Sequence, residues 1–245
     1  MVTAIDYESQ QMILERLREP MTQYDLGYLT EEATDNGSRF TKDYFWCIDP
    51  LDGTLAFTEQ RPGYSVSIAL VARAGRPVIG VVHDPVTDEV FTAMAGEGHD
   101  FPAKKEDKGI KQLFCYFDES MKNHPKYADV LKGLEAIVVE VGLPGLELRY
   151  GNGSVLNACQ VAQHEQAIYF KLPKPNTGGG STWDFAATAC LFAELGNDAT
   201  DTYGEPLQFN DRETTFMNRR GVVYSSNPTL QQHVLALCSR LRGGH

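Results

Sequence analysis

Six consecutive residues, Asp49-Pro50-Leu51-Asp52-Gly53-Thr54, combine two carboxylates with a glycine and a hydroxyl. Divalent cations such as Mg²⁺ prefer carboxylate, carbonyl and water oxygens and keep positions open for phosphate oxygens. Pro50 stiffens the turn, which helps to aim both carboxylates and the Leu51 carbonyl at one point. If a helix begins here, the N–H groups of Gly53 and Thr54 can meet a phosphate. The motif predicts metal-dependent phosphate chemistry, and the simpler alternative is a capped turn at a strand end.

Further acidic residues lie on both sides of this motif. Glu31 and Glu32 precede it, and Asp184 follows Trp183 at the start of a predicted helix. Taken singly, the glutamates are typical of a solvated surface and Asp184 of a helix N-cap. Taken together with the motif, Glu31 and Asp184 bring the number of carboxylates to four. Such a group stays ionised in one pocket only when cations neutralise it, so the set predicts a multi-cation site.

The elements predicted around the motif in the first half are a helix and several strands. An apolar strand over residues 44–48 leads into it. Residues 7–17 have the apolar spacing of an amphipathic helix. Residues 64–72, 78–82 and 89–94 are β-rich runs separated by turn-forming residues. These three runs predict an antiparallel meander.

The second half alternates between predicted strands and helices. Strands are predicted over residues 113–117 and 136–141, and helices over 126–134, 155–163 and 183–195. A lysine-rich polar stretch, residues 103–109, predicts the boundary between the halves. We therefore expect an α+β half, residues 1–110, that carries most metal ligands. An α/β half, residues 111–245, would carry Asp184 and the substrate-selecting loops.

Composition limits the classes of function. The net charge of −11 argues against binding to a nucleic acid polymer, which requires basic surface, and an anionic substrate would need bound cations. No apolar run approaches the length of a membrane span, and residues 1–6 do not resemble a signal peptide, so a cytoplasmic location without membrane contact is predicted. The five cysteines are widely spaced, which predicts reduced thiols in the core.

The order of these acidic residues resembles that of the lithium-sensitive inositol monophosphatase superfamily, which includes the 3′(2′),5′-bisphosphate nucleotidases. The similarity covers almost the whole chain through the following segments: residues 2–6, 31–32, 49–54, 63–70, 80–85, 153–154 and 183–187. It implies an α/β fold, specifically the layered α-β-α-β-α sandwich shared with fructose-1,6-bisphosphatase. It also implies a phosphomonoesterase that Li⁺ inhibits.

The resemblance further implies two or three Mg²⁺ ions. The first would be held by Glu31, Asp49 and the carbonyl of Leu51. The second would be held by Asp49, Asp52 and Asp184, and Glu31 would reach a third through water. Asp49 would then bridge two ions.

Catalytic and phosphate-binding roles follow from the same resemblance. Thr54 and Asp6 would orient and deprotonate the attacking water, and Glu31 is counted with them as catalytic. Read without the resemblance, Asp6 is a helix cap. The predicted phosphate and substrate contacts are Asp52, Gly53, Thr54, Gly153, Ser154 and Asp184.

The nature of the substrate is less closely defined. Residues 153–159 resemble the Gly-Ser-x-Leu-Lys-x-Cys pattern of bisphosphate nucleotidases, although Asn157 replaces the lysine that would meet a second phosphate. Thr177, within the glycine-rich residues 176–182, stands where inositol monophosphatases carry an inositol-binding acid. The glycine run itself is either a ligand contact or a flexible loop. We predict hydrolysis of a small anionic phosphate ester, namely adenosine 3′,5′-bisphosphate, to AMP and phosphate.

Two alternatives to a bisphosphate nucleotidase stay open. The chain is an inositol-1-monophosphatase, or it is an inactive protein that binds a phosphorylated ligand. Residues 52–55 also match the end of the haloacid dehalogenase signature, but Pro50 occupies the position of its nucleophilic aspartate, so no phosphoenzyme is expected.

Family members carry a further helix ahead of Asp6, so the first N-terminal helix is interpreted as lost or truncated. The surface it leaves is interpreted as a homodimer contact or a scar of truncation. Residues 99–112 also depart from the family pattern.

Overall fold

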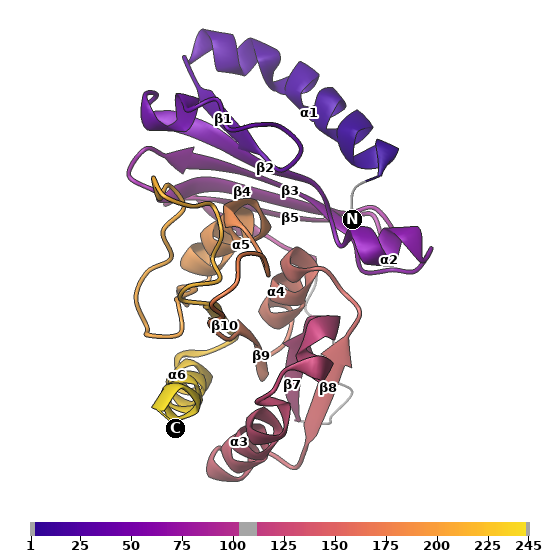
Figure 1. The fold of residues 1–245 in the computed structure, drawn as a ribbon, viewed down its shortest axis with the longest axis vertical. Helices are drawn as coiled ribbons and strands as arrows, with labels where there is room; N and C mark the ends of the chain where they lie inside the picture. Colours follow the sequence, from indigo (N-terminus) through magenta and orange to yellow (C-terminus); the bar gives the residue numbers. More distant parts are fainter. Residues whose placement is uncertain (1–2, 103–111, 244–245) are drawn as a thin grey trace.

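The chain is arranged in five layers in the computed structural model, which describes residues 3–102 and 112–243 (Figure 1). Helix α1 (Ala4–Gln23) lies on the outer face of a six-stranded sheet. Helices α4 (Ser154–Ala162) and α5 (Thr182–Glu194) lie between this sheet and a four-stranded one. Helices α3 (Tyr127–Glu140) and α6 (Pro228–Gly243) cover the far face. The predicted α-β-α-β-α sandwich is confirmed.

The six-stranded sheet contains the predicted meander. Its strands follow chain order: β1 (Gly27–Thr30), β2 (Tyr44–Asp52), β3 (Ser65–Ala72), β4 (Pro77–Asp84), β5 (Glu89–Met94) and β6 (Gly98–Asp100). Strands β1 and β2 are parallel and the other neighbours antiparallel. Every second residue of β3 is buried, because one face of the sheet packs on α5. Gly80 allows this close packing, since a Cβ there would lie 2.4 Å from the Ala187 carbonyl oxygen.

The four-stranded sheet has the order β10-β9-β7-β8. Its strands are β7 (Leu113–Phe117), β8 (Leu146–Tyr150), β9 (Ala167–Lys171) and β10 (Val222–Ser225). Strand β7 is parallel to both neighbours and every one of its residues is buried, as expected where helices cover both faces of a sheet. The remaining elements are short: α2 (Thr54–Thr58) and the 3-10 turns η1 (Ser38–Phe40) and η2 (Glu119–Asn123).

The strand predicted over residues 136–141 is wrong, because α3 continues to Glu140. Its β-branched residues favour a strand locally, but burial follows the helical period. Val130, Leu134 and Ile137 are buried on one side, while Val139 is 79% exposed on the other. Packing of that side against α6 therefore outweighs the local preference.

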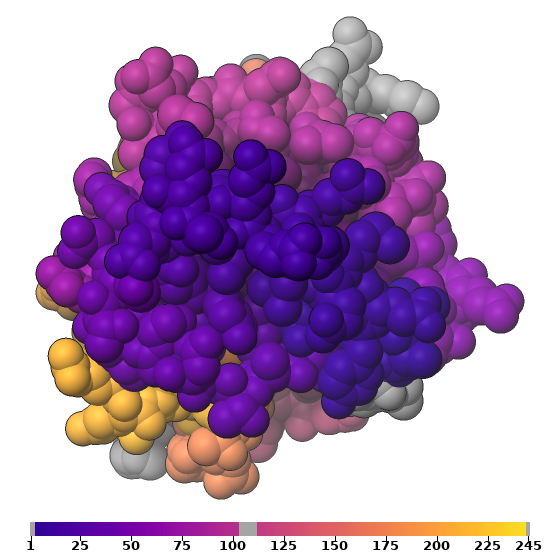
Figure 2. All heavy atoms as spheres, turned by 90° about the horizontal axis from the view of Figure 1, so that it is seen from above, coloured from indigo at the N-terminus to yellow at the C-terminus, as the bar shows by residue number. Residues whose placement is uncertain are grey.

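Helix α1 is held at the end of β2 by polar contacts. The side chains it buries most fully are those of Asp6 and Gln10. Gln10 accepts a hydrogen bond from the Glu32 N–H at 3.0 Å, and Ser9 donates one to the Pro50 carbonyl at 2.9 Å. Figure 2 shows the indigo helix lying across this face, with purple and magenta segments visible around it. These contacts tie α1 to the predicted site.

Other sequence predictions have mixed outcomes. All five cysteines are buried and free, as predicted. The polar stretch over residues 103–109, and with it the boundary between the halves, lies outside the described residues, so the division into 1–110 and 111–245 stays a prediction. In the described ranges, no helix combines the length and apolar character needed to cross a membrane.

Candidate metal centre

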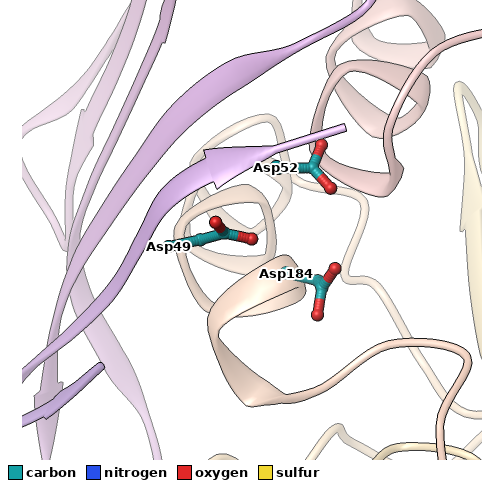
Figure 3. Close-up of side chains that lie close together, drawn as sticks. All are labelled: Asp49, Asp52 and Asp184. Carbon is teal, nitrogen blue, oxygen red and sulfur yellow. The ribbon is translucent and has the colours of Figure 1, made fainter. Parts of the chain in front are cut away.

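Three carboxylates that are distant in sequence meet between the sheets (Figure 3). Asp49 and Asp52 lie near the end of β2, and Asp184 is the third residue of α5. One oxygen of each lies within 4.8 Å of the others. Residues three apart in a regular strand point to opposite faces, but the register of β2 against β3 shifts between Asp49 and Asp52. This irregularity allows both side chains to reach one cluster.

Asp52 also joins β2 to the start of α4. Its two carboxylate oxygens accept the N–H groups of Ser154 at 3.1 Å and Val155 at 2.9 Å. The first turn of a helix has unpaired N–H groups and a partial positive charge, so an anion is favourable there. Gly153 permits this approach, because a Cβ at that position would lie 2.1 Å from Asp52 Oδ2.

Asp184 is fixed by the first turn of its own helix. Ser181, not Asp184, is the N-cap of α5, and the Ser181 N–H donates to Asp184 Oδ2 at 2.6 Å. The reciprocal bond from the third residue to the Ser181 side chain completes a capping box. The helix terminus thereby sets the direction of the carboxylate.

Thr54 and Asp6 meet at the edge of the cluster. The Thr54 hydroxyl lies 3.4 Å from Asp6 Oδ1 and 3.2 Å from the Leu51 carbonyl oxygen. Asp6 is held in turn by the N–H and hydroxyl of Thr3, which form the capping box of α1. Gly53 is the N-cap of α2, so a helix does begin at the position where the phosphate-binding hypothesis requires one. The structure thus brings Thr54 within hydrogen-bonding distance of Asp6, whereas the roles predicted for this pair stay predictions.

The electrostatics of the cluster disfavour a full set of negative charges. Burial, and then the charges of Glu31 and Asp184, raise the pKa of Asp49 well above its ordinary value. Burial, and then Asp184, do the same for Asp52, whereas Lys171 acts in the opposite direction. The pKa of Asp184 is likewise raised, mainly by burial. Cations would offset this cost, because they stabilise the ionised carboxylates.

Glu31 lies at the accessible rim of the cluster. A side-chain hydrogen bond joins it to Asp49. Partial removal of the carboxyl group from water raises the pKa of Glu31 to about 7; the hydrogen bond to Asp49 opposes this shift and the charge of Asp184 adds to it. The ligands brought together are therefore all oxygens, with no histidine or cysteine in the group found among the described residues. Such a donor set fits a hard cation such as Mg²⁺.

Gly153 and Ser154 lie beside the cluster, although their N–H groups already have protein acceptors. Gly153 donates to the Gly63 carbonyl at 2.7 Å, and Ser154 donates to Asp52. In this arrangement Ser154 orients Asp52, and Gly153 leaves room for it. The phosphate contacts predicted for both residues stay predictions.

Two charged residues of the site were not identified from the sequence. Lys171, the last residue of β9, lies 2.5 Å from Asp118 Oδ2 and 3.1 Å from Ser154 Oγ. Asp118 also accepts hydrogen bonds from Tyr169 at 3.0 Å and Asn157 at 3.3 Å. The sequence signal that could have revealed them is a charged residue at the end of an apolar strand. Asp118 directly follows β7, and Lys171 ends β9.

Comparisons with known proteins agree with this geometry. A model described as "Inositol monophosphatase family" matches residues 1–242. The 3′(2′),5′-bisphosphate nucleotidase CysQ of Shigella flexneri is 30% identical over 224 residues, which cover 89% of this chain and 82% of that protein. Inositol monophosphatase 2 of Solanum lycopersicum is 28% identical over 226 residues, which cover 89% of this chain and 81% of that protein. The solved inositol monophosphatase of Anabaena (Nostoc) has a TM-score of 0.70 and 26% identity, covering 98% of this chain and 87% of that one.

Proposed function

This chain belongs to the inositol monophosphatase family and is a hydrolase of phosphoric monoesters, and from that premise we propose that it acts on a 3′(2′),5′-bisphosphate nucleotide such as adenosine 3′,5′-bisphosphate. The products would be AMP and phosphate. The observation that carries the hydrolytic part is the meeting of Asp49, Asp52 and Asp184 beside the Thr54–Asp6 pair. The choice of a nucleotide is supported by the similarity to a bisphosphate nucleotidase and by the cationic Lys171 on the wall of the site.

The proposed cofactor is Mg²⁺, bound as two or three ions. Glu31, Asp49 and the Leu51 carbonyl would hold one ion. Asp49, Asp52 and Asp184 would hold another. When bound, Mg²⁺ neutralises charge on the phosphoryl oxygens and favours ionisation of a nearby water.

The chain's own side chains would position the reacting groups. The Thr54 hydroxyl would donate to Asp6, leaving its oxygen to hold the attacking water in line with the phosphorus. Asp6 would accept the proton through Thr54. Glu31 would help to orient the water from its place beside Asp49. Asp52 would gain rigidity from the N–H groups of α4, which reduces the motion that misaligns a catalytic site.

Hydrolysis of an inositol monophosphate is the second candidate. It is supported by the similarity to the inositol monophosphatase of Solanum lycopersicum at 28% identity. The two candidates share the metal cluster and differ in the group that surrounds the reacting phosphate. A comparison of substrates therefore separates them.

The experiment is phosphate release from adenosine 3′,5′-bisphosphate, inositol 1-phosphate and fructose 1,6-bisphosphate, each with Mg²⁺ and with EDTA. We expect turnover that requires Mg²⁺, with the largest kcat/KM for the nucleotide. The variant Glu135→Gln, which removes an exposed acid from α3, is a matched control and should behave as the wild type. Preference for inositol 1-phosphate would favour the second candidate, and no turnover of any ester would contradict the proposal.

A further inference from the structure

Arg39, a buried residue of η1, contacts the loop that leads into β10. We propose that Arg39 is a positioning residue: it ties the segment that carries Glu31 to the segment that supports Asp184, and so sets the Mg²⁺ affinity of the cluster. Among its described contacts Arg39 bonds to neither carboxylate, so it acts through the segments that carry them. This inference rests on the proposed function, because it takes both carboxylates to be metal ligands.

The guanidinium of Arg39 is enclosed by polar partners. The residue is 3% exposed, and its Nε lies 2.7 Å from Asp35 Oδ2. Its Nη1 donates to the side-chain oxygen of Asn210 and to the carbonyl of Asp211, both at 2.8 Å. A buried charge costs free energy unless a counter-charge and hydrogen bonds compensate it. These partners must therefore stay in place for Arg39 to remain buried.

On one side, these contacts close the loop that begins with Glu31. Asp35, the ion-pair partner of Arg39, lies within this loop. Ser38, the residue before Arg39, accepts the Tyr28 N–H with its hydroxyl oxygen at 3.0 Å. Tyr28 belongs to β1, which ends directly before Glu31. The loop is thus held at its start by the sheet and at its end by η1.

On the other side, Asn210 and Asp211 belong to the segment that supports the start of α5. This segment is the loop ahead of β10, drawn in orange to gold, which extends to the six-stranded sheet (Figure 1). Asp211 Oδ1 accepts the N–H groups two and three residues further along, at 2.6 and 3.3 Å, which fixes the turn. The Thr215 carbonyl then accepts the N–H of Thr182, the first residue of α5, at 2.8 Å. A shift of this segment would move the helix terminus that directs Asp184.

Asn210 makes the link reciprocal. Its side-chain nitrogen donates to the Arg39 carbonyl at 3.0 Å and to the Arg73 carbonyl at 2.8 Å, while its oxygen accepts from the guanidinium. Both amide N–H groups are used, so the side chain is held in one orientation. The ring of Phe40 adds a further contact, since its centroid lies 3.9 Å from the guanidinium carbon of Arg39 and 5.3 Å from that of Arg212. The two segments are therefore joined through main chain and side chains.

The two carboxylates related by this link come from different layers of the fold. Glu31 follows a strand of the six-stranded sheet and shares a hydrogen bond with Asp49. Asp184 lies on a helix between the sheets, with a carboxylate oxygen within 4.8 Å of one from Asp49. A cation binds more tightly when its ligands are held in place before it arrives. Arg39 supplies such a restraint from outside the cluster.

The test is calorimetry of Mg²⁺ binding to Arg39→Lys, Asn210→Ala and the double variant, at a temperature where circular dichroism shows each one folded. Lysine keeps the charge but lacks the planar fork of donors. We expect the Kd for Mg²⁺ to rise about tenfold in each single variant, as for loss of a group that supports a metal ligand. The double variant should also lose about tenfold, rather than about a hundredfold, because the two side chains form one contact. The control Arg219→Lys makes the same exchange at an exposed ion pair with Glu213 and should bind Mg²⁺ as the wild type does.

Kinetics and hydrogen exchange separate this role from a loss of stability. At saturating Mg²⁺, kcat of Arg39→Lys should stay within about twofold of the wild type, while the Mg²⁺ concentration for half-maximal rate increases about tenfold. In EDTA, amide exchange in this variant should be faster over residues 31–37 and 180–184 and unchanged over residues 130–138 of α3. A residue that only stabilises the fold would lower the unfolding temperature without this pattern.

Each outcome decides the proposal. Unchanged Mg²⁺ binding in both single variants of a wild type that binds Mg²⁺ would overturn the inference and leave the proposed function intact. Losses that multiply in the double variant, or an equal loss in Arg219→Lys, would also overturn it. If Arg39→Lys does not fold, Asn210→Ala decides alone. A wild type that binds no Mg²⁺ would contradict the proposed cofactor, and the link between the segments would then be rejected if exchange over residues 31–37 is the same in both proteins.

Discussion

The Asp52 carboxylate accepts the N–H of Val155 at 2.9 Å, although 103 positions separate the two residues. A metal ligand of the proposed site is therefore also the anion at the start of α4. Through this contact the first sheet, which carries the acidic motif, is coupled to the layer of helices between the sheets. The site and the packing of the six-stranded sheet against α4 depend on the same side chain.

Asp52→Asn should abolish most activity without unfolding the protein. The amide oxygen can still accept one helix N–H, and removal of a charge relieves repulsion from Asp184. The loss of a metal ligand should lower kcat/KM by about 100-fold or more. Steady-state kinetics and thermal unfolding check both parts. Activity within tenfold of the wild type would contradict the metal role of Asp52.

Gly153→Ala should damage the same site through a steric clash. The added Cβ would lie 2.1 Å from Asp52 Oδ2, while φ of −65° at this position is acceptable for alanine. We expect the free energy of unfolding to fall by about 1–3 kcal/mol and Mg²⁺ binding to weaken. Gly145→Ala is the control, since the nearest atom to its Cβ would be 4.0 Å away. Equal behaviour of the two variants in denaturant and in calorimetry with Mg²⁺ would show that Asp52 does not require this glycine.

The stability of the metal-free protein should decrease as pH rises. The pKa of Glu31 is raised from 4.5 to about 7, and the pKa values of Asp49 and Asp52 are also raised. The folded state therefore holds more protons than the unfolded state between these values, so the free energy of unfolding falls as pH increases from about 4.5 through 7. Mg²⁺ should remove much of this decline.

Urea unfolding at pH 5.5, 6.5 and 7.5, with EDTA and with Mg²⁺, measures this dependence. Asp49→Asn should flatten the decline in EDTA, because it removes the carboxylate on which Glu31, Asp184 and Asp52 all act. A stability that stays constant or increases with pH in EDTA would show that the carboxylates do not repel one another as described.

Thr54→Val and Asp6→Asn should each lower kcat by about 100-fold or more, because they remove the groups that position and deprotonate the water. Asparagine retains an oxygen that can accept from Thr3, so the start of α1 should remain folded. Ser9→Ala is the matched control, since it removes a bond between α1 and Pro50 without touching the Thr54–Asp6 pair. A comparable loss in Ser9→Ala would mean that the placement of α1, rather than proton transfer, limits the reaction.

The sequence identifies the acidic residues of the site better than it identifies Lys171 and Asp118, the two charged residues that lie beside them. Asp49, Asp52 and Asp184 occur in distinctive patterns, and the structure brings them together. Lys171 ends one short apolar strand and Asp118 follows another, both without a recognisable motif. The parallel pairing of β7 with β9 makes them neighbours. The proximity of Lys171 and Asp118 therefore depends on the order of the strands in the sheet, which no local sequence pattern reveals.

Local patterns also explain which elements were predicted. The meander of β3 to β5 has turn signals and alternating burial, so it is visible in the sequence. Strands β8, β9 and β10 have four or five residues each and lack these signals. The β-branched end of α3 was mistaken for a strand, because its helical burial depends on contact with α6.

The most direct test of the account is phosphate release from adenosine 3′,5′-bisphosphate as a function of Mg²⁺ concentration, in the wild type and in Asp49→Asn. Asp49 lies at the centre of the cluster, next to Glu31, Asp52 and Asp184. We predict no release by the wild type in EDTA, a saturable increase with Mg²⁺, and no comparable release by Asp49→Asn at any Mg²⁺ concentration. Equal rates with EDTA and Mg²⁺, or full activity of Asp49→Asn, would contradict a metal-dependent phosphatase centred on these carboxylates.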